Sequence, residues 1–165
     1  MGKKSVRENK TVYQQSREAA GLTRAAASDA MVYVSEDRIE KIEYETSAAH
    51  PDEVLAMADC YKDPALCNYY CSHECPIGRE YVPEVRMKDL SQITLEMLAT
   101  LNSLSKEKER LVEITVDGSI TGDEMPDFLR IKEQLERMSL AVDALQLWVD
   151  NAVSTGSVIP LLILL

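Results

Sequence analysis

The residues with the clearest chemical potential lie in one short segment, CNYYCSHEC. It places Cys67, Cys71 and Cys75 at a constant spacing of four residues, with His73 between the last two. Thiolates and an imidazole are common ligands of a tetrahedral zinc ion, and three thiolates can hold an iron–sulfur cluster. Cys60, seven residues before Cys67, is a candidate for a fourth ligand. The segment therefore predicts a metal site, with zinc or an iron–sulfur cluster as the cofactor.

Two other interpretations of these cysteines stay open. The segment lacks the two matched C-x-x-C pairs that are typical of a strong zinc motif. Buried thiols packed beside Tyr69 and Tyr70 account for the same spacing, because free cysteine behaves as a small apolar residue. A thiol-based redox switch is the third alternative. Since the opening MGKKSVRENK is followed by polar sequence, we expect a cytoplasmic protein with reduced thiols.

A series of short helices is predicted before and around the cysteines, from the spacing of apolar and small residues. The predicted helices span 11–20, 23–31, 35–45, 51–61 and 64–71. Thr23 and Ser35 are suitable N-caps, and Pro51 suits the first turn of a helix. Residues 76–86 contain two prolines and a glycine, which predicts a linker. We therefore expect an N-terminal helical domain over residues 1–75.

Two longer helices are predicted after the linker, within residues 87–155. The first has apolar residues at helical spacing over 90–104, and the second keeps steps of three and four over 128–152. The stripe of the second helix comprises Phe128, Ile131, Leu135, Met138, Val142, Leu145, Val149 and Ala152. A turn signal at 117–118 favours an antiparallel hairpin, and a second copy of the chain could also supply the partner helix. We expect this coiled-coil-like hairpin to dimerise the protein, and an apolar tail to follow at 156–165.

The composition supports an all-α protein with an aliphatic core. Apolar residues make up 45% of the 165 residues, aromatic residues only 5%, and there are just 6 Gly and 6 Pro. The net charge of −10 argues against a nonspecific nucleic-acid coat and against an anionic membrane surface as partner. The apolar end, VIPLLILL, is far shorter than the roughly 20 residues that span a bilayer, so no membrane role is expected.

Three segments in the first half resemble a known family. REAAGLT at 17–23 resembles the R-E-x-x-G-L-T opening of the phage-repressor/Cro-like (XRE-type) helix-turn-helix family. Residues 35–43 resemble the S-x-x-x-I-x-x-I-E run of its recognition helix, and 51–61 resemble the P-x-x-x-L-x-x-L-A-x-x-Y stretch of its fourth helix. The resemblance covers residues 6–62. It implies a lambda-repressor-like five-helix domain and a homodimeric transcriptional regulator that binds double-stranded DNA in a sequence-specific manner.

The chain departs from the family pattern at three places. Arg24 stands where the family usually has Gln, on the helix that braces the phosphate backbone. The turn that contains VYV is one residue longer and lacks the usual glycine. Tyr44 and Glu45 replace the basic–Gly pair that often closes the third helix. These departures concern the docking on DNA more than the fold.

The resemblance indicates which residues of this chain would contact DNA. Ser35 and Asp37, at the N-terminal end of the third helix, are placed to meet base edges, where an acidic side chain can accept from cytosine. Arg38 and Lys41 lie three residues apart and could share the same exposed face. Arg24 and the basic N-terminal segment would contact phosphates.

The charge along this region also supports a different class of function. Residues 1–24 hold six basic and two acidic residues, whereas residues 25–45 hold two basic and six acidic ones. A recognition helix with more acid than base favours the alternative of a protein-interaction or adaptor module that keeps the fold without reading DNA. No nucleophile–histidine arrangement and no Gly-rich phosphate loop is visible in the sequence, so we do not expect an enzyme.

Overall fold

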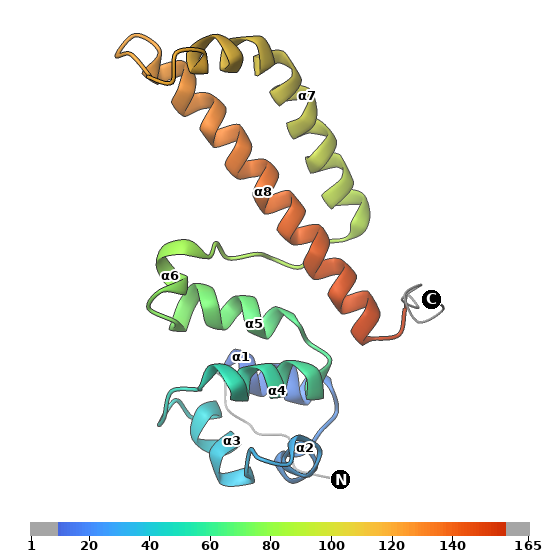
Figure 1. Ribbon diagram of the computed structural model, residues 1–165. Coiled ribbons are helices and arrows are strands. Elements are labelled where there is room, and N and C mark those ends of the chain that lie inside the picture. Colours follow the sequence, from blue (N-terminus) through green and yellow to red (C-terminus); the bar gives the residue numbers. More distant parts are fainter. Residues whose placement is uncertain (1–9, 158–165) are drawn as a thin grey trace, which may run out of the picture. The chain divides into compact units, whose positions relative to one another are not determined.

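The computed structural model describes residues 10–157, and within that range every regular element is a helix. The chain divides into two compact units (Figure 1). The first comprises Met1–Glu84 with Val149–Leu165, and the second comprises Val85–Trp148. The all-α prediction is therefore confirmed for the described residues.

The first unit is built from short helices whose starts were visible in the sequence. They are α1 (Val12–Ala19), α2 (Arg24–Met31), α3 (Glu36–Glu43), α4 (Pro51–Tyr61) and α5 (Ala65–Tyr69). Side-chain oxygens of Thr11, Thr23 and Ser35 each accept a hydrogen bond from a backbone N–H in the first turn of the helix that follows. These N-caps satisfy donors that a helix start leaves without an intrahelical partner.

The core of the first unit joins all five helices. Ile39 on α3, Met57 on α4 and Leu66 on α5 are completely buried. The other buried apolar residues of this core are Tyr13, Ala27, Met31, Val34, Ile42, Ala49, Val54, Ala58 and Tyr61. Full burial of one such large aliphatic side chain contributes about 1.5–3 kcal/mol, so this contiguous cluster holds the short helices together.

The segment after α5 differs from the expected linker. The chain continues from α5 into a π-helical segment, η1 (Tyr70–Glu74), and then forms α6 (Gly78–Tyr81). A Cβ atom at Gly78 would overlap the backbone carbonyl of Cys71, so only glycine lets α6 approach η1 this closely. Residues 78–81 of the predicted linker over 76–86 are therefore helical, and the boundary between the two compact units, after Glu84, falls inside the predicted range.

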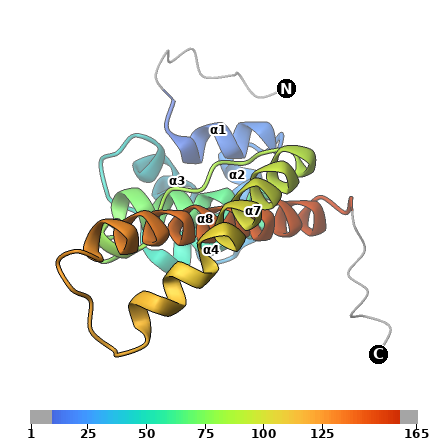
Figure 2. The same cartoon turned by 90° about the horizontal axis from the view of Figure 1, so that it is seen from above.

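The second unit contains α7 (Leu90–Thr115) and most of α8 (Met125–Ser154), which run in opposite directions (Figures 1 and 2). Arg110 contacts Asp127 at 2.8 Å, and Arg130 forms an ion pair with Glu107, so charged pairs join the two helices near their connecting loop. In the described part of the chain, no helix combines the length and the apolarity that crossing a bilayer requires.

The apolar stripe predicted for the second long helix is only partly buried. Ile131 is buried, whereas Leu135 and Val142 are both 47% exposed. Ala141 and Ala144, which were outside the predicted stripe, are buried instead. Within the described residues, α8 therefore leaves part of its predicted apolar stripe exposed to solvent.

Candidate nucleic-acid interface

The connection between α2 and α3 has the geometry of a glycine turn without a glycine. Val32 adopts φ +66°, a left-handed conformation that is strained for a β-branched residue, and its side chain is 90% exposed. Val34 is buried, and the Tyr33 hydroxyl donates to the carbonyl oxygen of Asp52 at 2.9 Å. These two contacts hold the turn in place, so the chain tolerates the strain at Val32.

A buried carboxylate joins three helices behind α3. Arg17 on α1 donates to both Glu43 oxygens, at 2.5 and 3.0 Å, and Arg24 on α2 donates to the same carboxylate at 2.8 Å. Glu43 is 1% exposed and Arg17 is 7% exposed. Two guanidinium groups therefore compensate the charge of one buried carboxylate, which fixes the orientation of α3 against α1 and α2.

Arg24 is committed to this internal cluster rather than to solvent. Besides Glu43, its guanidinium contacts Glu40 at 3.2 Å and lies over the ring of Tyr44, 4.9 Å from the ring centroid. A cation over an aromatic face gains further electrostatic attraction. The residue expected to brace a phosphate therefore connects α2 to α3 in this conformation.

Arg38 is also held by partners within the first unit. Its guanidinium donates to both oxygens of Glu53 at 2.6 and 2.7 Å, to the Ser47 hydroxyl at 2.6 Å and to the Ala48 carbonyl at 2.7 Å. The same Glu53 accepts from the backbone N–H of His50 at the start of α4, and the Arg38 guanidinium lowers its pKa. Four of the five N–H donors of Arg38 are thus used to attach α3 to the loop and to α4.

The remaining predicted contact residues share solvent exposure. Ser35, Asp37 and Lys41 are all exposed, and the Ser35 hydroxyl additionally caps α3 by accepting from the Arg38 N–H at 3.3 Å. Glu36 is exposed close by, so this surface carries more acid than base. Of the five predicted DNA contacts, three are available to a partner and two are engaged in structural ion pairs.

The structure does not gather the predicted metal ligands. All four cysteines are free thiols, and among residues 10–157 no group of three His, Cys, Asp or Glu side chains could hold a metal ion. Cys75 leaves the π-helical segment in an extended conformation, and its sulfur accepts from the N–H of Gly78 at 3.4 Å. Burial raises the pKa of the Cys67 thiol, as expected for a packed thiol.

His73 takes part in an aromatic contact instead of a cysteine cluster. Its ring stacks on that of Tyr69, with centroids 4.6 Å apart and an interplanar angle of 18°. His73 Nδ1 lies 2.8 Å from the Ser72 hydroxyl. The partial burial of the cysteines agrees with the packed-thiol interpretation, and the metal and redox-switch interpretations stay predictions.

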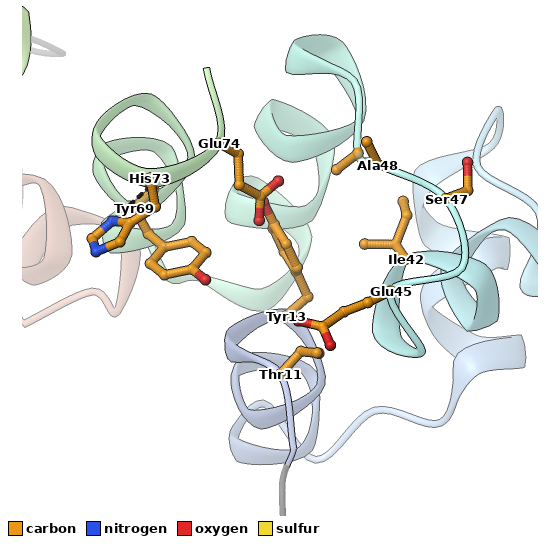
Figure 3. A pocket seen from close by; sticks show the side chains of 10 residues that line it. Thr11, Tyr13, Ile42, Glu45, Ser47, Ala48, Tyr69, His73 and Glu74 are labelled. Atoms are coloured by element: carbon orange, nitrogen blue, oxygen red, sulfur yellow. Dashed lines mark hydrogen bonds between the residues drawn. The ribbon is translucent and has the colours of Figure 1, made fainter. Parts of the chain in front are cut away.

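A pocket that sequence reasoning did not find lies at the C-terminal end of α3. It encloses about 430 Å³ and is lined by residues from α1, the loop after α3, α5 and η1 (Figure 3). Glu45 and Glu74 place two carboxylates in its lining, and Tyr13 and Tyr69 supply aromatic rings. These residues are separated by up to about sixty positions, so no local motif in the sequence indicates the site.

Two groups on one side of this pocket, Glu74 and Tyr13, have raised pKa values. Burial raises the pKa of the Glu74 carboxyl. Burial and the neighbouring Glu74 charge also raise the pKa of Tyr13. Although the two groups are neighbours, the buried Tyr13 hydroxyl has no partner with good hydrogen-bond geometry. The pocket thus contains one buried hydroxyl, that of Tyr13, which Glu74 satisfies only in part.

Comparison with known proteins does not assign either site. No family model, curated protein or solved structure matched the chain. The contacts and charges of the described residues are therefore what bears on function.

Proposed function

We propose that this chain is a sequence-specific DNA-binding regulator of transcription that acts as a homodimer. The observation that carries the proposal is the way α3 is supported: Glu43 and Arg38 attach its rear side to three other helices, while Ser35, Asp37 and Lys41 stay exposed. A helix that reads base edges needs such rigid support, because discrimination depends on placing a few side chains accurately in the major groove.

In the proposed DNA complex, few side chains contact phosphates, and a carboxylate and a hydroxyl group contact the bases. Asp37 can accept from a cytosine amino group, and Ser35 can donate or accept at a base edge. Lys41 supplies the positive charge on this face, since Arg24 and Arg38 are engaged elsewhere. Because each neutralised phosphate contributes a slope of about −0.9 to the dependence of log K on log salt, we expect a shallow salt dependence.

The solvent-facing stripe of the second unit supports the homodimer. Leu135 and Val142 on α8 are seven residues apart and half exposed, and α7 exposes Leu95, Leu98 and Leu101. A seven-residue apolar repeat is the spacing that packs two helices along a common seam. A second copy of the chain on this stripe would give two α3 helices, which could read half-sites about 34 Å apart.

Selection from a random duplex library tests this function, with the protein purified without oxygen and assayed at low and physiological salt. We expect enrichment of a two-fold symmetric site that Asp37→Asn combined with Lys41→Ala abolishes. Lys62→Ala is the matched control, because Lys62 is an exposed lysine on the C-terminal side of α4, away from α3. Absence of enrichment at both salt concentrations, with a folded and dimeric protein, would contradict the proposal.

One observation favours a second candidate function, a protein-interaction module. Arg24 and Arg38 both pair with carboxylates of the same unit, and the exposed start of α3 carries Glu36 and Asp37. Such an acidic surface suits a basic protein partner better than a phosphate backbone. This module would give no enriched DNA site, and Lys41→Ala would leave its activity unchanged.

A further inference from the structure

The pocket at the C-terminal end of α3 is formed jointly by segments that lie far apart in the sequence. Its lining comes from three separate stretches of the first unit, at 11–13, 42–49 and 69–74. Figure 3 shows Glu74 and Glu45 beside the Tyr13 ring, with Tyr69 and His73 on the neighbouring helix. A volume of about 430 Å³ lies within the usual range of small-molecule sites, about 300–1,000 Å³.

The two carboxylates in the lining of this pocket outnumber its one basic residue, His73. Glu45 and Glu74 both line it; burial is the main cause that raises the pKa of Glu74, and the charge of Glu45 adds to it. Within residues 10–157, the ion pairs of arginines 17, 24 and 38 go to other carboxylates, and none reaches either of these two acids. A bound cation would relieve the repulsion between the two carboxylates.

The aromatic part of the lining also suits a cation. Tyr13 and Tyr69 lie edge to face, with ring centroids 6.0 Å apart and an interplanar angle of 83°. The negative face of an aromatic ring attracts a positively charged group, more strongly where water is partly excluded. Tyr13 is only 4% exposed, and its hydroxyl interacts with Glu74 without reaching good hydrogen-bond geometry, so the fold satisfies this hydroxyl only in part.

Two observations favour an organic cation over a metal ion. The residues that line the pocket do not form any group of three metal-ligating side chains, as holds for all of the described chain. Its volume exceeds what a bare ion fills, whereas aromatic walls add favourable contact with carbon–hydrogen groups of a ligand. The combination of two carboxylates and two tyrosine rings therefore selects a ligand with a cationic nitrogen and an apolar body.

We propose that this pocket binds a small organic cation, an amine whose charged nitrogen lies between Glu45 and Glu74 against the tyrosine rings. The inference goes beyond DNA binding and does not depend on it, since no residue of the exposed face of α3 lines the pocket.

Titration calorimetry of the whole chain with 1,4-diaminobutane at low salt tests the inference, and 1,4-butanediol is the uncharged control. We expect saturable binding of the diamine and none of the diol. Glu45→Gln and Glu74→Gln should each weaken diamine binding about tenfold, the effect of losing one charge-assisted contact. Tyr69→Leu should weaken it about three- to fivefold, through the lost aromatic face. Glu36→Gln, which removes an exposed acid on α3, should leave binding unchanged.

Several outcomes would overturn the inference. These are no saturable diamine binding, equal binding of the diol, or unchanged binding in both glutamine variants. Magnesium that competes with the diamine and is lost in the same variants would show an inorganic cation site instead. If circular dichroism shows that Glu74→Gln is unfolded, Glu45→Gln decides alone, because Glu45 is exposed and its loss leaves the core intact.

Discussion

Two acidic regions of the first unit differ in whether their carboxylates pair with arginines. Behind α3, Glu43 and Glu53 are each held by at least one arginine at hydrogen-bond distance. At the C-terminal end of the same helix, Glu45 and Glu74 share a pocket and neither is in an ion pair with the arginines of this unit. The comparison suggests that the paired acids serve stability, whereas the acids that no arginine of residues 10–157 pairs with serve a ligand.

The largest expected effect comes from removing the acid at the centre of the paired region. Glu43→Ala leaves Arg17 buried without its carboxylate, which should lower the free energy of unfolding by about 3–5 kcal/mol. Urea denaturation measures this loss, and Glu40→Ala serves as a control, because the Glu40 side chain is 47% exposed. A loss below about 1 kcal/mol would show that the cluster does not stabilise the fold.

Gly78→Ala should damage the pocket and spare the paired region. The new Cβ would overlap the Cys71 carbonyl and displace η1, which carries Glu74, at a cost of about 1–3 kcal/mol. We expect diamine binding to be lost while hydrogen exchange in α3 stays slow. Retained binding, or exchange that becomes faster throughout α3, would contradict this separation of the two regions.

Arg38→Ala should cost about 2 kcal/mol at neutral pH, because it removes charge-assisted hydrogen bonds to Glu53 and contacts to the following loop. The effect should depend on pH. Arg38 holds the pKa of Glu53 below its ordinary value, so this stabilisation is present above the unfolded-state pKa and is lost as the pH falls through the folded-state pKa.

Urea midpoints of the wild type and the Arg38→Ala variant, measured between about pH 7 and pH 3, test the linkage. The difference between the two proteins should shrink towards the acidic end of the series. A difference that stays constant over this range would mean that the charge of Glu53 contributes nothing.

The smallest expected effect concerns an acid of the pocket. Glu45→Gln removes repulsion from Glu74 without removing an ion pair, so the free energy of unfolding should stay constant or rise by about 0.5 kcal/mol. Thermal unfolding without ligand measures this change. A loss of more than about 1 kcal/mol would show that Glu45 stabilises the fold, and would contradict the distinction between the paired acids and the pocket acids.

Local signals in the sequence were sufficient to predict α1 to α4 and the two long helices, but not η1 and α6. Thr23 and Ser35 cap the helices that they were predicted to cap, and Pro51 begins α4 as expected. These features depend on residues only a few positions apart, where backbone hydrogen-bonding rules apply directly. The all-α class follows from the same signals.

The directions of side chains and the long-range contacts could not be predicted in this way. Arg38 lies on α3 as expected, but its direction is decided by Glu53 on another helix. Gly78 was assigned to a linker because the reason for a glycine at this position, its contact with the backbone of Cys71, is not visible in the sequence. The pocket needs residues from three distant stretches, which periodicity within one helix cannot bring together.

The position of Glu43 also has a consequence for how the first unit opens. One carboxylate of α3 is shared by an arginine of α1 and an arginine of α2. Detaching α1 or α3 would leave a buried charge without its main partner, and detaching α2 would remove one of the two guanidinium groups that compensate Glu43. Local openings of the three helices should therefore merge into one cooperative unit with a common free energy of opening. Amide protons across α1, α2 and α3 would then report a single event, although their helices have only eight residues each.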